Sequence, residues 1–198
     1  MKKFVVYLVS VLFFFHTFLL AYDSDPKNFV EELVNDAINK LSDKNLNKEE
    51  KANFIEILAL ENIDINALGL YTLGELRKSS NKETLTKYQQ SFKKYFLKSL
   101  TSRLTDYSSS RFEVLNADKK SSNYTIVISK ISPNDGGPEI KIDWRIYTKN
   151  PDRPLIRDLI VEGLSLARTQ KEEFASILNS NNNDINFLIS KLKEFVNK

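Results

Sequence analysis

The stretch that decides the fold class is IKIDWRIYT, residues 140–148. Apolar and polar residues alternate along it, which is the pattern of a half-buried β-strand. Side chains of a strand point alternately to its two faces, so the apolar positions would share one face of a sheet. That predicted apolar face consists of Ile140, Ile142, Trp144 and Ile146.

Three further segments have strand patterns and place residues 140–148 within a sheet. Apolar and β-branched residues mark residues 112–114, 124–131 and 155–166. Gly163 is expected to form a bulge or a bend within the last of these segments. Because clusters of turn-forming residues separate the segments, we predict a four-stranded antiparallel meander.

Helical patterns precede and follow the predicted strands in the sequence. Asp25-Pro26 is typical of a helix start, and Asn47 with Glu50 has the spacing of a capping box. The longest helix is predicted from Ser80 to about Tyr107, and two helices close the chain. We therefore predict an α+β fold in which N-terminal helices, one long central helix and C-terminal helices pack on the four-stranded antiparallel sheet.

The first 21 residues have the pattern of a secretory signal. Lys2 and Lys3 precede an apolar run that extends to Leu20, and Ala21 follows as a small residue. Cleavage near Ala21 would place one domain, residues 22–198, outside the cytoplasm. A retained N-terminal anchor is the alternative, because the run is close to the shortest length that spans a membrane.

Composition excludes several kinds of chemistry. The chain has no cysteine, and its single histidine, His16, lies in the signal segment. Disulfides, a thiol nucleophile and cysteine or histidine metal ligands are therefore absent from residues 22–198, and no cofactor or metal is expected. The formal charge of +3 falls to +1 without Lys2 and Lys3, which does not favour a nucleic-acid partner.

A resemblance to a known family rests on the fourth strand and the helix after it. RDLIVEGLSL (157–166) and TQKEEF (169–174) are similar to the signature of the MlaC family of periplasmic phospholipid-transport proteins. DINALG (64–69), the long helix and IDWRI (142–146) resemble further segments of that family, with Trp144 where tyrosine is usual. The resemblance covers essentially all of the chain after the signal.

The resemblance implies a soluble, monomeric periplasmic carrier with a glycerophospholipid as its cargo. It would shuttle this lipid between an inner-membrane ABC transporter complex with a lipid-binding ring subunit and an outer-membrane lipoprotein complex. Exposed acyl chains cost about 0.8 kcal/mol per methylene, so a carrier must hold them in an apolar cavity between sheet and helices. The expected lining residues are Phe92, Phe96, Leu100, Ile142, Trp144, Ile146, Leu159 and Val161.

Two functions from other classes stay open at this point. A small envelope enzyme of the isomerase type could use Asp143 or Asp158 with Tyr147 or Tyr107, because a carboxylate and a tyrosine suffice for such chemistry. An envelope adaptor that binds only protein is the other. Bound lipid would distinguish a carrier from an adaptor, and turnover of a small carbonyl substrate would indicate an enzyme.

Overall fold

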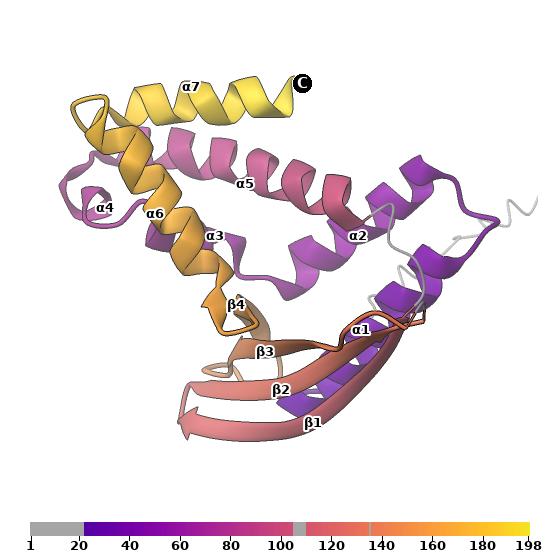
Figure 1. Ribbon diagram of the computed structural model, residues 1–198. Helices are drawn as coiled ribbons and strands as arrows, with labels where there is room; N and C mark the ends of the chain where they lie inside the picture. The colour runs from indigo at the N-terminus through magenta and orange to yellow at the C-terminus, as the bar shows by residue number, and fades with distance from the viewer. Residues whose placement is uncertain (1–21, 105–109, 135) are drawn as a thin grey trace, which may run out of the picture.

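A computed structural model describes residues 22–104, 110–134 and 136–198. The predicted signal segment and Tyr107 lie outside the described residues. Figure 1 shows a curved sheet with α1 on one side and α3, α5, α6 and α7 on the other. The helices are α1 (Pro26–Ser42), α2 (Lys48–Asn62), α3 (Ile65–Thr72), α4 (Leu76–Ser79), α5 (Lys82–Leu104), α6 (Leu166–Asn179) and α7 (Ile185–Val196).

Side-chain caps begin these helices close to where the sequence predicts. Asp25 accepts hydrogen bonds from the backbone of Lys27 and Asn28 at the start of α1. Asn47 and Glu50 form the predicted reciprocal capping box of α2. The long helix α5 begins slightly later than predicted, because Asn81, and not Ser80, accepts the hydrogen bond from the Thr84 backbone N–H (2.8 Å).

The sheet is antiparallel and its strands follow chain order, which confirms the predicted α+β class. It contains five strands, one more than predicted, in the order β1-β2-β3-β4-β5. They are β1 (Ser110–Ser121), β2 (Tyr124–Pro133), β3 (Ile140–Tyr147), β4 (Leu155–Val161) and β5 (Leu164–Ser165).

The extra strand arises because the predicted fourth strand is divided. Glu162 and Gly163 both have positive φ, 49° and 81°, which is the backbone of a two-residue hairpin turn. Val161 therefore pairs with Leu164, and the expected bend at Gly163 is a full reversal of the chain. Ser165 then caps α6 by accepting a hydrogen bond from the Arg168 backbone N–H (3.0 Å), so α6 starts directly after the hairpin.

Two separate hydrophobic cores stabilise the fold. The sheet core joins α1 to one face of the sheet and consists of Phe29, Val30, Leu33, Val34, Val127, Trp144, Ile146 and Ile156. The helical core joins the other helices and consists of Ala59, Ile65, Leu73, Tyr88, Phe92, Leu97, Phe174, Leu178, Ile185, Leu188, Ile189 and Leu192.

The helical layer and the sheet meet along β4. Ile63, which follows α2, forms a parallel bridge with Ile156, and the Asp64 backbone N–H donates to the Ile156 carbonyl (2.9 Å). These contacts hold the start of α3 against the sheet. In the part of the chain that the structure describes, no helix combines the length and the apolar character needed to cross a bilayer.

Candidate functional site

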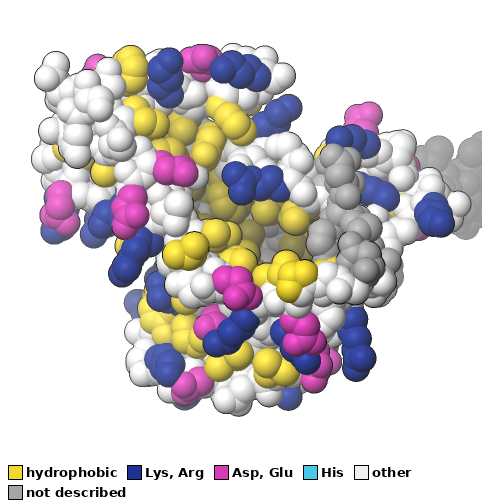
Figure 2. Space-filling model, viewed as in Figure 1, with side chains coloured by type: hydrophobic (Ala, Val, Ile, Leu, Met, Phe, Trp, Pro, Cys, Tyr) yellow, Lys and Arg dark blue, Asp and Glu magenta, His cyan; other side chains and the backbone are white. Residues whose placement is uncertain are grey.

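A pocket of about 830 Å³ lies between the helical layer and the sheet face opposite α1. Figure 2 shows hydrophobic side chains gathered where these two parts of the molecule meet, with charged side chains around them. The lining comes from α3, from all four long strands and from the start of α6. It consists of Ala67, Leu68, Tyr71, Asp118, Lys120, Ser121, Tyr124, Ile126, Ile128, Asp143, Arg145, Arg157, Ile160 and Ala167.

Apolar and ionic side chains alternate on the floor of the pocket, and this mixture follows from strand register. One row across the sheet places Asp143 between Ile128 and Ile160. The next row places Ile126 beside Arg145, whose other neighbour is Asp158. The floor therefore offers isoleucine side chains to an apolar ligand and carries ionic groups among them.

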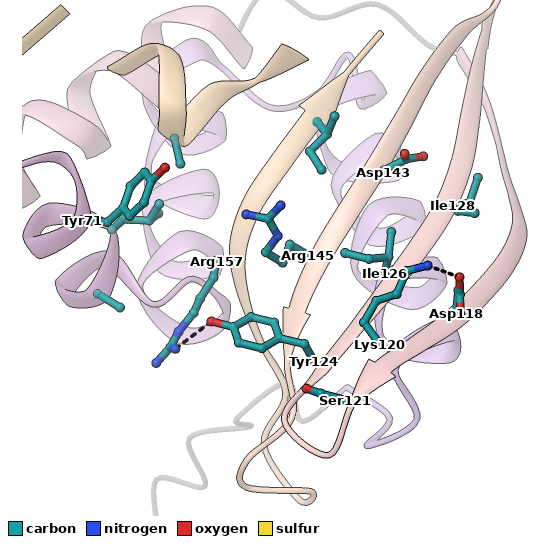
Figure 3. Close-up of a pocket in the computed structure, with 14 residues that line it drawn as sticks. Tyr71, Asp118, Lys120, Ser121, Tyr124, Ile126, Ile128, Asp143, Arg145 and Arg157 are labelled. Carbon is teal, nitrogen blue, oxygen red and sulfur yellow. Dashed lines mark hydrogen bonds and ion pairs between the residues drawn. The ribbon is translucent and has the colours of Figure 1, made fainter. Parts of the chain in front are cut away.

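A β-bulge brings Arg157 into the pocket. The pairing of β3 with β4 shifts between Arg145 and Ile146, so Arg157 is an extra residue without a partner in the ladder. Neighbours in a regular strand point to opposite faces, but this bulge places Arg157 and Asp158 on the same face. Two cationic side chains, Arg145 and Arg157, consequently line one cavity (Figure 3).

Arg157 is held by partners from both layers. Its Nε and Nη2 donate to Asp64 Oδ2 (2.9 and 2.7 Å), and its Nη1 donates to the Tyr124 hydroxyl (2.9 Å). Its guanidinium carbon lies 3.4 Å from the centre of the Tyr147 ring. Burial disfavours its charge, but the hydrogen bonds with Tyr124 and Asp64 outweigh burial and raise the pKa of Arg157. Arg157 is thus a permanently charged connection between sheet and helices.

Asp158 is a buried carboxylate that connects the sheet to α6. Its side chain is 1% exposed and accepts hydrogen bonds from Ser165 Oγ (2.6 Å), the Ala167 backbone N–H (3.0 Å) and Arg145 Nη1 (3.3 Å). These donors satisfy a buried carboxylate and attach the start of α6 to the sheet. The tyrosines considered with it in an isomerase site are not beside it in the described structure: Tyr147 stacks under Arg157, and Tyr107 is outside the described residues.

The eight residues expected to line a lipid cavity fall into two separate places. Phe92 is in the helical core, and Phe96 and Leu100 pack against that core. Trp144 and Ile146 are in the sheet core, Ile142 and Leu159 pack against it, and Val161 pairs with Ile142 on the same face. In the described residues the two sets thus belong to different cores, because α1 packs on this face of the sheet. None of the eight lines the described pocket.

The pocket residues that sequence reasoning missed come from the opposite face. Ile126, Val127 and Ile128 are three consecutive apolar residues of β2, and such a run indicates a strand that is covered on both faces. Val127 enters the sheet core, while Ile126 and Ile128 line the pocket. No group of three or more metal-ligating side chains occurs among residues 22–104, 110–134 and 136–198.

Comparisons with known proteins agree with this fold. The sequence matches the family model for the MlaC protein over residues 31–194. A solved phospholipid-binding protein from Ralstonia solanacearum, in complex with a phospholipid, is similar in structure, with a TM-score of 0.69 and 19% sequence identity. The similarity covers 84% of this chain and 94% of that chain. None of the curated proteins searched matches the sequence significantly.

Proposed function

We propose that this chain, which belongs to the MlaC family, is a carrier that binds a glycerophospholipid in the pocket between its helical layer and its sheet. The carrier acts in the periplasm as a monomer, after removal of the signal near Ala21. It is a binding protein and not an enzyme. It exchanges its lipid with an inner-membrane ABC transporter complex and an outer-membrane lipoprotein complex.

The observation that carries this proposal is the pocket itself. Its volume of about 830 Å³ is within the range of about 300–1,000 Å³ that ligand sites have. Ile126, Ile128 and Ile160 give acyl chains an apolar surface, while the ionic groups around them can meet a headgroup. The similar protein from Ralstonia solanacearum holds a phospholipid, which supports lipid as the ligand class.

Transfer to a partner requires a change in relative affinity. A carrier that buries acyl chains holds them strongly, so release needs a partner that favours an open form or competes for the lipid. The pocket is bordered by α3 and α6 on one side and by the sheet on the other. A partner that separates these two walls would expose the chains and so lower the affinity for the cargo.

Two adjacent residues of β4 test the location of the lipid. Ile160 lines the pocket, whereas Val161 pairs with Ile142 on the face that packs on α1. Both side chains are partly exposed, so each position can accept a glutamate without placing it in a fully buried core. Ile160→Glu is expected to lose copurifying phospholipid, because a carboxylate would lie against the acyl chains. Val161→Glu is the matched control and should keep its lipid.

Native mass spectrometry of the purified proteins, with circular dichroism as a check of folding, measures the outcome. Loss of lipid from Val161→Glu alone would place the cargo on the other face, as the sequence predicts. Wild-type protein without any copurifying lipid would argue against a carrier. If Ile160→Glu does not fold, Ile126→Trp provides a second test, because it fills the pocket with apolar volume and should reduce lipid loading.

A further inference from the structure

Asp143 is an ionisable side chain on the floor of the pocket, flanked by two isoleucines. It lies on β3 between Ile128 and Ile160, and its side chain is 22% exposed. Its Oδ1 is buried and has no hydrogen-bond partner among the described residues. The ion pair with Lys141 is long, with Nζ 3.6 Å from Oδ1, which exceeds hydrogen-bond distance. The protein thus leaves this carboxylate incompletely satisfied.

The other acidic groups of this region differ from Asp143. Asp118 also lines the pocket, but it forms an ion pair with Lys120 (Figure 3). Asp158 accepts hydrogen bonds from three donors of the protein. A buried acceptor without a protein donor is unusual in native structures, so the donor to Asp143 must be water or a ligand in the pocket.

A cationic side chain stands two residues from Asp143 on the same face of β3. Arg145 contacts Asp158 through Nη1 at 3.3 Å, and its side chain is 43% exposed. A guanidinium has five N–H donors, so most of them stay available to a ligand at the cavity. Asp143 and Arg145 together present a negative and a positive group, side by side, to whatever fills the pocket.

Binding of lipid raises the free-energy cost of keeping Asp143 ionised without a hydrogen-bond donor. A lipid that fills the pocket displaces water from its floor, and a carboxylate without water or another donor is strongly disfavoured. A ligand that supplies an N–H donor removes this penalty. A ligand with only a phosphate would increase it, because two anionic groups would then share a site of low polarity.

We propose that Asp143 makes the carrier selective for phospholipids whose headgroup carries a primary ammonium, with the ammonium at Asp143 and the phosphate at Arg145. This inference rests on the proposed function. A primary ammonium donates three hydrogen bonds, whereas a quaternary ammonium carries the charge without any N–H donor. Headgroups should therefore load in the order ethanolamine, choline, glycerol.

The test measures which headgroups the protein extracts from vesicles. Delipidated wild-type protein is incubated with vesicles of equimolar phosphatidylethanolamine, phosphatidylcholine and phosphatidylglycerol that have the same acyl chains. Mass spectrometry of the recovered protein gives the lipid composition. Wild-type protein should be enriched about tenfold in phosphatidylethanolamine over phosphatidylglycerol, a difference of about 1.4 kcal/mol.

Variants assign this enrichment to the carboxylate. Asp143→Asn should bring the ratio of the two lipids close to one, and Asp143→Leu should do the same without any polar group. Asp152→Asn is the matched control, because Asp152 is exposed in the turn between β3 and β4 and its replacement changes the net charge equally. This control should keep the wild-type ratio.

The outcomes separate the two proposals. Wild-type protein that takes up no lipid overturns the carrier function and the selectivity with it. Wild-type protein that takes up all three lipids in equal amounts overturns the selectivity alone. Enrichment that persists in both Asp143 variants would show that another group recognises the headgroup. That result would overturn the assignment of selectivity to Asp143.

Discussion

Arg157 should contribute more to stability than any exposed ion pair of the described chain. Replacement by alanine removes two hydrogen bonds to Asp64, one to Tyr124 and the stacking on Tyr147. Removing one partner of a buried ion pair costs about 3–5 kcal/mol. The side chains of Arg157 and Asp64 are 26% and 18% exposed, so water recovers part of this loss. We therefore expect the free energy of unfolding to fall by about 2–4 kcal/mol.

Urea denaturation followed by circular dichroism measures this change. With a slope of about 2 kcal/mol per molar urea, the midpoint for Arg157→Ala should fall by about 1–2 M. Arg157→Lys should recover less than half of the loss, because an ammonium cannot reproduce the planar fork of donors. The control is Lys87→Ala, since the pair of Lys87 with Glu83 is largely exposed and screened by water, so its removal should leave the midpoint nearly unchanged.

One result would refute this reasoning about Arg157. If Arg157→Ala moved the midpoint no further than Lys87→Ala, the ion pair between sheet and helices would not stabilise the fold. The Asp64→Asn variant and the double variant then complete a thermodynamic cycle. A coupling energy near zero between positions 64 and 157 would show that the two residues act independently, contrary to their 2.7 Å contact.

Two further substitutions test the packing of each core. Gly69→Ala should lower the melting temperature by about 2–4 °C, which corresponds to a net loss of about 1 kcal/mol in stability. The reason is that the new Cβ would lie 2.8 Å from Cδ1 of the buried Phe92 ring. An unchanged melting temperature would show that the ring can shift. Ser129→Ala should cost about 1–3 kcal/mol by leaving Trp144 Nε1 without its 2.8 Å acceptor. Fluorescence of this single tryptophan follows the unfolding, and Ser190→Ala, at an exposed position, serves as the control. Equal unfolding midpoints for Ser129→Ala and Ser190→Ala would contradict the prediction.

Local chemistry explains why much of the fold could be predicted. The caps at Asp25 and Asn47 join groups two or three residues apart, so their partners are visible in the sequence. The alternation along β3 also separates its two faces correctly, with Trp144 and Ile146 in the sheet core and Asp143 and Arg145 at the pocket. Five strands, and not four, follow from the turn at Glu162, a residue type that rarely adopts positive φ.

The position of the pocket depends on interactions that periodicity does not describe. The alternation along β3 predicts an apolar face that packs on the long helix, but α1 has an apolar stripe of its own and covers that face. The face with the strongest apolar pattern forms a packed core, and the face with mixed polar and apolar residues borders the cavity. The β-bulge at Arg157 also changes the face of one side chain, and no residue pattern marks its position.

The two cores alternate along the chain. In chain order, α1 contributes to the sheet core, α2–α5 contribute to the helical core, the strands contribute to the sheet core, and α6 and α7 contribute to the helical core. The polypeptide consequently passes three times between the two cores. No single cut of the chain therefore separates the residues of one core from those of the other. During synthesis α1 must wait for strands that begin about seventy residues later, and the cavity forms only when the whole chain is assembled.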